Sequence, residues 1–132
     1  MKIALNMAAA TLALFGAVGA AYALAQAPGS NREDLQRHDL SAPGREVIQV
    51  RVGFAPGYVA PKHTHPGEEI IYVLEGELEY EIDGEVTRVK PGDVLFVPAG
   101  AVHTARNLGD GNAAELATYI VEKSKPLITL VD

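Results

Sequence analysis

Short runs of alternating apolar and polar residues fill the chain from Arg45 onward, and turn-forming residues interrupt them every several positions. Alternation with a period of two is typical of β-strands that bury one face, whereas a helical apolar period does not occur in this region. Many short strands at such intervals predict an all-β sandwich or barrel. Strands are expected at residues 48–54, 69–75, 77–82, 85–90, 94–97, 102–107 and 113–122.

One hairpin can be aligned residue by residue, because the Asp-Gly pair at 83–84 is a strong signal for a two-residue turn that fixes the register. This register places Glu79 opposite Arg88 and Glu77 opposite Lys90, which predicts two cross-strand ion pairs on a solvated face. A slip by one residue would carry these acids into the core, so charge and hydrophobicity agree on the alignment. The opposite, buried face would carry Leu78, Tyr80, Ile82 and Val89.

Three of the four histidines lie in two strings of residues with fixed spacing. Residues 57–76 read G-x5-H-x-H-x3-E-x6-G, and residues 92–107 read G-x5-P-x-G-x2-H-x3-N. His63 and His65 are two residues apart and therefore project from one face of an extended segment, and Glu69 follows a Pro-Gly turn that can return it to them. Imidazole and carboxylate donors suit iron, manganese, nickel, copper or zinc, so the strings predict a site for a divalent transition metal.

Together the two strings resemble the paired motifs of the cupin family without a departure, over roughly residues 45–122. The resemblance implies a small jelly-roll barrel, or double-stranded β-helix, with an N-terminal polar arm and a metal site inside the barrel. Among cupins, the chain is similar to the small single-domain type that resembles bacterial quercetin dioxygenases. The resemblance further implies that the metal ligands are His63, His65, Glu69 and His103.

The predicted site admits more than one chemistry, because four protein ligands leave about two positions open on an octahedral ion. Resemblance to flavonol-cleaving cupins favours a metal-dependent oxidoreductase of the dioxygenase type. The alternatives are a Lewis-acid isomerase or lyase, in which Glu69 is ligand and proton acceptor by turns, and a non-catalytic periplasmic protein that binds metal or a small ligand. A small aromatic or enolic substrate is expected because the predicted pocket walls are mostly apolar. These walls are Ile71, Val73, Leu78 and Tyr80, with Ile82 and Val89 beside them.

The N-terminal residues are typical of an export signal. Lys2 precedes an apolar stretch that ends in an A-x-A cleavage site at residues 23–25, so residues 1–25 are expected to be removed after Ala25. A membrane anchor is the competing interpretation, but the stretch is mostly alanine and glycine rather than leucine. The mature protein is therefore predicted to be periplasmic or secreted.

The segment that follows the signal is polar and contains turn residues. Residues 26–44 are expected to form a flexible arm, in which a capping box at 30–33 starts one short helical turn through Leu35. Residues 45–132 would then form the barrel domain.

Composition limits the partners of the protein. The formal net charge is −6 and Lys and Arg do not cluster, which argues against nucleic acid, and the chain has no cysteine for disulfides or thiolate ligands. The expected partner is a small molecule, with no membrane contact after signal cleavage. The strand at 69–75 is apolar on both faces and residues 127–131 form another apolar run, so a homodimer through one sheet face is predicted.

Overall fold

The computed structural model describes residues 28–132, and in this part of the chain it contains ten β-strands and no helix. The export signal predicted at 1–25 lies outside the described residues. Within them, no helical segment has the length and hydrophobicity that crossing a bilayer requires. The strands are β1 (Ser30–Asp39), β2 (Arg45–Phe54), β3 (His63–Thr64), β4 (Gly67–Glu75), β5 (Leu78–Ile82), β6 (Glu85–Val89), β7 (Val94–Val97), β8 (His103–Asn107), β9 (Ala113–Glu122) and β10 (Thr129–Leu130).

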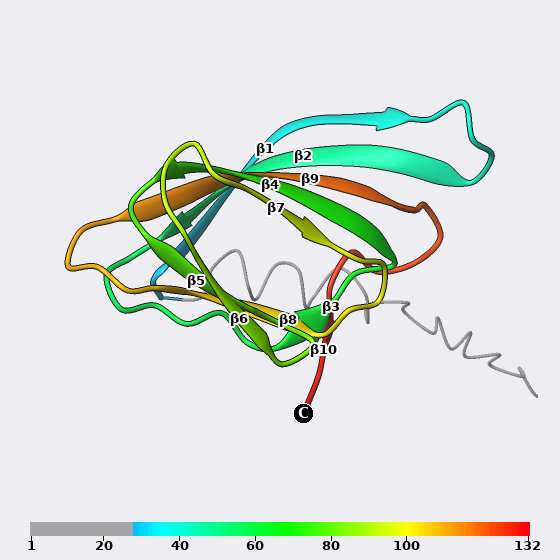
Figure 1. The fold of residues 1–132 in the computed structure, drawn as a ribbon. Coiled ribbons are helices and arrows are strands. Elements are labelled where there is room, and N and C mark those ends of the chain that lie inside the picture. The colour runs from blue at the N-terminus through cyan, green and yellow to red at the C-terminus, as the bar shows by residue number, and fades with distance from the viewer. Residues whose placement is uncertain (1–27) are drawn as a thin grey trace, which may run out of the picture.

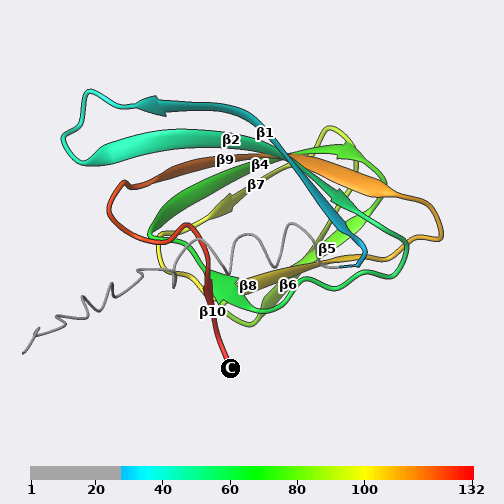
Figure 2. The same ribbon diagram turned by 180° about the vertical axis from the view of Figure 1, so that it is seen from behind.

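The strands form two five-stranded sheets that lie face to face (Figures 1 and 2). The first sheet has the order β1-β2-β9-β4-β7 and the second has the order β10-β3-β8-β5-β6. The chain changes sheet at every connection except β1–β2 and β5–β6, so strands that are distant in sequence become neighbours. This architecture confirms the predicted all-β jelly roll.

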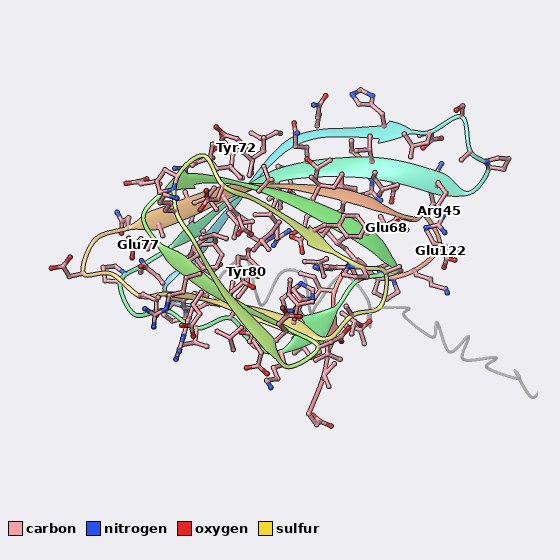
Figure 3. The ribbon with its side chains drawn as sticks, in the orientation of Figure 1. Arg45, Glu68, Tyr72, Glu77, Tyr80 and Glu122 are labelled. Carbon is pink, nitrogen blue, oxygen red and sulfur yellow. The ribbon has the colours of Figure 1, made fainter. Side chains whose placement is uncertain are left out.

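All seven predicted strands are present, with ends that differ by at most three residues. Their alternation decides which face is buried, as in β2, where half-buried residues alternate with the buried Val50, Val52 and Phe54. Figure 3 shows Tyr80 between the two sheets, where it is 2% exposed, whereas Tyr72 on the outer side of β4 is 46% exposed. The core therefore lies between the sheets, and the outer faces carry the alternate residues.

The β5–β6 hairpin has the predicted register over its whole length. The ion pair between Glu79 and Arg88 is present at 3.0 Å. Arg106 of β8 also contacts the Glu79 carboxylate, so Glu79 is 8% exposed and not solvated as predicted. The predicted pair of Glu77 with Lys90 is not formed among the described residues, because β5 begins after Glu77 and the Lys90 amine turns to an aspartate in the next turn.

Residues 30–39 form the strand β1, so the predicted flexible arm with a helical turn is wrong for this segment. β1 pairs with β2 along its length, with one irregularity between Asp34 and Gln36. Arg37 donates hydrogen bonds of 2.7 and 2.6 Å to the carboxylate of Glu46 in β2, which is 4% exposed. Main-chain pairing and these charged contacts take the place of the apolar face that the sequence pattern lacks, which is why the pattern did not predict a strand.

Gly76 turns the chain between β4 and β5 in a left-handed conformation, with φ of +69°. A Cβ atom at this position would lie 2.7 Å from the Ala113 Cβ and 2.7 Å from the Asn112 carbonyl oxygen, both closer than side chains approach. Gly92 has a similar conformation, with φ of +91°, but nothing lies within 4 Å of a Cβ built there. A side chain at either position would strain the backbone, but only a side chain at Gly76 would also overlap neighbouring atoms.

We predict that Gly76→Ala destabilises the fold by at least ~3 kcal/mol, because left-handed strain and overlap with β9 add together. Gly92→Ala is the matched control and should cost only the strain, about 1 to 2 kcal/mol. Urea denaturation followed by circular dichroism measures both free energies of unfolding. Equal losses for the two variants would show that contact with β9 does not fix this corner.

Candidate metal centre

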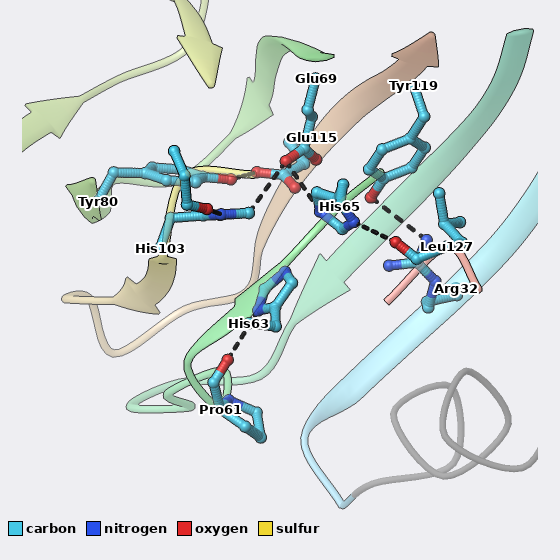
Figure 4. Close-up of polar contacts among 11 residues, drawn as sticks. Arg32, Pro61, His63, His65, Glu69, Tyr80, His103, Glu115, Tyr119 and Leu127 are labelled. Atoms are coloured by element: carbon cyan, nitrogen blue, oxygen red, sulfur yellow. Dashed lines mark hydrogen bonds and ion pairs between the residues drawn. The ribbon is translucent and has the colours of Figure 1, made fainter. Parts of the chain in front are cut away.

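The four residues that the motifs single out come together between the two sheets, at one end of the barrel (Figure 4). His63 lies on β3, His65 follows it, and His103 lies directly opposite His63 on β8 of the same sheet. Glu69 lies on β4 of the other sheet. The chain crosses between the sheets at Gly67, where any Cβ would overlap the backbone of β9. The motif spacing therefore places ligands on both sides of a single gap.

The distances at this gap are those of a shared site. The ligand nitrogens of the three histidines lie within 4.8 Å of one another. Glu69 Oε2 lies 3.3 Å from His65 Nε2 and 3.2 Å from His103 Nε2. His65, Glu69 and His103 are each less than 5% exposed, and His63 is half-buried towards the cavity. The four side chains thus converge in a space that bulk water barely reaches.

Hydrogen bonds to main-chain carbonyls orient all three imidazole rings. A carbonyl oxygen only accepts hydrogen bonds, so each Nδ1 carries a proton and each neutral ring presents its Nε2 lone pair to the centre of the site. Metal-binding histidines are commonly held in this way. The acceptors are the carbonyls of Pro61, at 2.7 Å from His63, of Leu127, at 2.6 Å from His65, and of Ala101, at 2.9 Å from His103.

The donor set fits a divalent transition metal. His65 Nε2 is buried and has no aligned hydrogen-bond partner among the described residues, although the Glu69 carboxylate lies nearby. Buried polar atoms rarely lack a partner, and a cation would supply one. Three imidazole nitrogens with one carboxylate suit iron, manganese, nickel, copper or zinc.

The titration behaviour of the ligands follows from this crowding. Burial, with the neighbouring charge of His103, lowers the pKa of His63 to about 4, so its imidazole is neutral at physiological pH. Burial alone would raise the pKa of Glu69, but the close imidazoles of His103 and His65, which stabilise its carboxylate when they are charged, lower it well below its usual value. Burial acts to lower the pKa of His103, and its contact with Glu69 more than offsets this and raises it. A bound cation would therefore displace a proton held between His103 and Glu69.

A cavity of about 40 Å³ opens beside these side chains, and its walls are mostly apolar, as the sequence predicted, although different residues form most of them. Tyr80 lines it as expected, but Ile71, Val73 and Leu78 do not, because they are fully buried in the core further along the barrel. The interior therefore has one end that is packed with apolar side chains and another end that holds the cavity and its charged groups. Apolar and aromatic side chains form most of the wall: Val52, Phe54, Tyr58, Ala60, Tyr80, Ala105, Tyr119 and Ile128. The other lining residues are Ser30, Arg32, His63, Glu69, His103 and Glu115.

That Arg32, Glu115 and Tyr119 line the cavity was not predicted from the sequence. The Tyr80 hydroxyl donates a hydrogen bond to the buried carboxyl group of Glu115, and Arg32 donates one of 3.3 Å to the Tyr119 hydroxyl. The sequence did contain a signal for Glu115 and Tyr119. Both occupy the alternate positions of β9 that carry the buried Ala113 and Ala117, so both point inward. Arg32 had no such signal, because all residues of β1 except Leu35 are polar, so the strand shows no alternation that would mark an inward face.

Comparison with known proteins gives matches over most of the barrel. A family model described as Cupin domain matches residues 50–120. Germin-like protein subfamily 2 member 2 of Arabidopsis thaliana is 37% identical over 86 residues, which cover 58% of this chain and 39% of the relative. The chain thus spans about two-fifths of the length of the first curated relatives that it matches.

Two solved structures are similar in both sequence and fold. An oxalate oxidase is 29% identical with a TM-score of 0.62, and the match covers 78% of this chain and 55% of that one. DMSP lyase DddQ from Ruegeria pomeroyi is 30% identical with a TM-score of 0.59, and the match covers 64% of this chain and 43% of that one. Similar barrels are therefore found in an oxidase and in a lyase.

We predict that a divalent metal stabilises the protein and that His65→Leu removes this effect, because the buried Nε2 is lost. Wild-type protein freed of metal by a chelator should gain about 2 to 3 kcal/mol when metal is present at ~100 times its dissociation constant. His38→Ala is the matched control, since His38 is exposed on β1. Thermal unfolding with elemental analysis measures both quantities, and unchanged metal content in His65→Leu would contradict the assignment.

Glu115 should make the stability of the metal-free protein depend on pH. Burial, followed by the charge of Glu69, raises the pKa of Glu115 to about 8 from an ordinary value of 4.5. The folded state therefore keeps a proton that the unfolded state releases, and the resulting stability is full below about pH 4.5 and is lost as the pH rises to about 8.

We predict that Glu115→Gln, which cannot ionise, becomes progressively more stable than wild type between pH 5 and pH 8. Calorimetric melting of both proteins in chelator, at one-unit intervals of pH, measures the difference. Glu85→Gln makes the same charge change at an exposed position and controls for net charge. Parallel pH profiles for Glu115→Gln and wild type would refute a protonated Glu115.

Proposed function

The chain belongs to the cupin family, and from this premise we propose that it is an exported, metal-dependent oxidoreductase of the dioxygenase type that acts on a small oxygen-bearing compound. The observation that carries the proposal is the convergence of three carbonyl-locked imidazoles on Glu69, with His65 Nε2 buried and unpartnered among the described residues. An arrangement that leaves ligand atoms without partners in the protein is difficult to explain as a purely structural core.

The proposed ligands are His63, His65, Glu69 and His103. A redox-active ion held by them would supply Lewis acidity and electron transfer towards dioxygen. Tyr80 would contact the substrate beside it: its hydroxyl donates its one proton to Glu115 and, because burial raises its pKa well above 10, stays neutral, so its oxygen is free to accept a hydrogen bond from a substrate hydroxyl group. The packed core beyond the cavity keeps water from entering through the opposite end of the barrel.

The small volume of the cavity, with a few polar groups in a mostly apolar wall, favours a small substrate with adjacent oxygen atoms, such as an enol or a dihydroxylated aromatic ring. Only part of an aromatic substrate would fit within about 40 Å³, so its ring would extend towards the cavity mouth. The similarity to an oxalate oxidase is consistent with oxygen chemistry on a small compound of this kind.

A Lewis-acid lyase or isomerase is the second candidate, and the buried Tyr80–Glu115 pair favours it. A protonated carboxyl group and a phenol beside an ion could donate and accept protons in an elimination that needs no dioxygen. DMSP lyase DddQ is as similar to this chain in sequence, at 30% identity, as the oxalate oxidase is at 29%, so sequence similarity supports the two classes equally. A periplasmic binding protein that holds a small ligand without turnover is the non-enzymatic candidate.

We predict that the protein loaded with iron, manganese, nickel or copper consumes dioxygen in the presence of an enol, catechol or flavonol, whereas the zinc form does not. His103→Ala should reduce the rate by more than ~100-fold, because it removes a ligand rather than a supporting contact. An oxygen electrode with product analysis checks this. Conversion without oxygen uptake would favour the lyase, and saturable binding without conversion would leave only the binding protein.

Localisation and assembly are also part of the proposal. The sequence of residues 1–25 supports export to the periplasm or the exterior. The outer side of β4 and β7 supports a homodimer, because large apolar side chains are exposed there without polar residues between them. This outer apolar patch consists of Ile70, Tyr72, Leu74, Val94 and Phe96, which are 41 to 67% exposed.

We predict that the wild-type protein is a dimer at micromolar concentration and that Phe96→Glu converts it to a monomer, because the change buries a charge in the proposed interface. Val86→Glu is the matched control, since Val86 is 57% exposed on β6 of the other sheet. Sedimentation velocity measures the mass of each. A wild-type monomer, or equal dissociation by both variants, would count against the outer apolar patch as the interface.

A further inference from the structure

Arg32 reaches the cavity from a strand that the sequence did not predict. It lies opposite Val52 in the β1–β2 pairing and lines the cavity together with His63, Glu69 and His103 (Figure 4). The pairing of β1 with β2 and the Arg37–Glu46 contact hold this strand in place. Arg32 therefore lies on an ordered strand whose main chain pairs with β2, and not on a flexible arm.

The guanidinium group of Arg32 has few partners for a half-buried charge. Among residues 28–132 its side chain makes one hydrogen bond, of 3.3 Å to the Tyr119 hydroxyl, and its Cζ atom lies 5.7 Å from the centre of that ring. No carboxylate oxygen of the described residues lies within 4 Å of the Arg32 nitrogen atoms, the limit for an ion pair. Four other arginines of the described residues, Arg37, Arg51, Arg88 and Arg106, each pair with a glutamate.

The fixed charges at the cavity do not balance without an anion. A divalent ion and Arg32 supply three positive charges, whereas Glu69 and Glu115 supply at most two negative ones. A charge taken out of water requires a partner of opposite sign, and a guanidinium offers paired N–H donors in the geometry of a carboxylate. We propose that Arg32 binds the carboxylate of a small carboxylic acid substrate whose other oxygen atoms face the metal centre.

This inference rests on the proposed function, since it assigns the substrate class of the same site. The volume of the cavity, about 40 Å³, is that of a few water molecules and therefore suits a carboxylate group with one or two further heavy atoms. Arg32 acts on the substrate directly, and Tyr119 positions the guanidinium through its hydroxyl group.

Calorimetric titration of the full-length protein loaded with cobalt(II) tests the proposal, with glycolate as the probe and ethylene glycol as its uncharged counterpart. We expect glycolate to bind at least ~10-fold more tightly than ethylene glycol. Arg32→Gln should weaken glycolate binding by ~10- to ~100-fold, the range for one charge-assisted hydrogen bond, and leave ethylene glycol binding unchanged. Arg32→Lys keeps the charge but lacks the paired N–H donors, so its affinity for glycolate should lie between those of the wild type and Arg32→Gln.

The controls separate this inference from the metal centre. Arg51→Gln makes the same charge change on the outer side of β2 and should alter neither affinity. Cobalt content and the visible spectrum of the ligand-free variants report the metal centre independently of glycolate, and thermal unfolding reports their folding. If Arg32→Gln does not fold, Arg32→Lys decides: weaker glycolate binding with full cobalt content supports the proposal.

Three results would overturn the proposal. Cobalt binding with no preference for glycolate over ethylene glycol, or unchanged glycolate affinity in the Arg32 variants, would remove the role of Arg32 and leave the metal centre intact. Tighter binding of inorganic phosphate than of glycolate would replace the carboxylate with another anion. Failure of the wild type to take up cobalt would remove the proposed function and this inference with it.

Discussion

The hydrogen bonds from His63, His65 and His103 to main-chain carbonyls are the constraint on which the site depends. Each bond fixes the tautomer and the direction of one ring, so three Nε2 atoms point at one place before any ligand arrives. The acceptor for His65 is Leu127, near the C-terminus, 62 residues away in the chain. The geometry of the centre therefore requires that the whole barrel, including its last segment, is closed.

The barrel interior is divided into two environments, one that stabilises the fold and one that holds the candidate metal centre. At one end Ile71, Val73 and Leu78 are fully buried and pack against the aliphatic residues of β2 and β9. At the other end a carboxylate, a carboxyl group and an arginine line the cavity with two histidines, and the third histidine lies beside them. Burial at the first end stabilises the fold, whereas at the second it changes pKa values and concentrates charge.

β1 connects these two roles. Charged contacts rather than an apolar face order the strand, through Arg37 on Glu46 and Lys123 on Asp39. Because the strand is ordered, Arg32 enters the cavity from the same side of the sheet as Val52. A polar segment that could have remained outside the domain thus completes the wall of the site and adds a positive charge to it.

The sequence by itself determined seven of the ten strands, because period-two alternation is a local property. The Asp83-Gly84 turn fixed the register of its hairpin for the same reason. The resemblance of the two motifs to those of cupins implied the jelly roll and the four residues that meet at the centre. Only the tertiary structure decided which inward residues reach the cavity. Ile71 and Glu69 share a face of β4, yet only Glu69 lines the cavity, since the opposing sheet fills the space at Ile71. The partners of Arg32 and Glu115 likewise come from distant strands, so no pattern within their own segments could specify them.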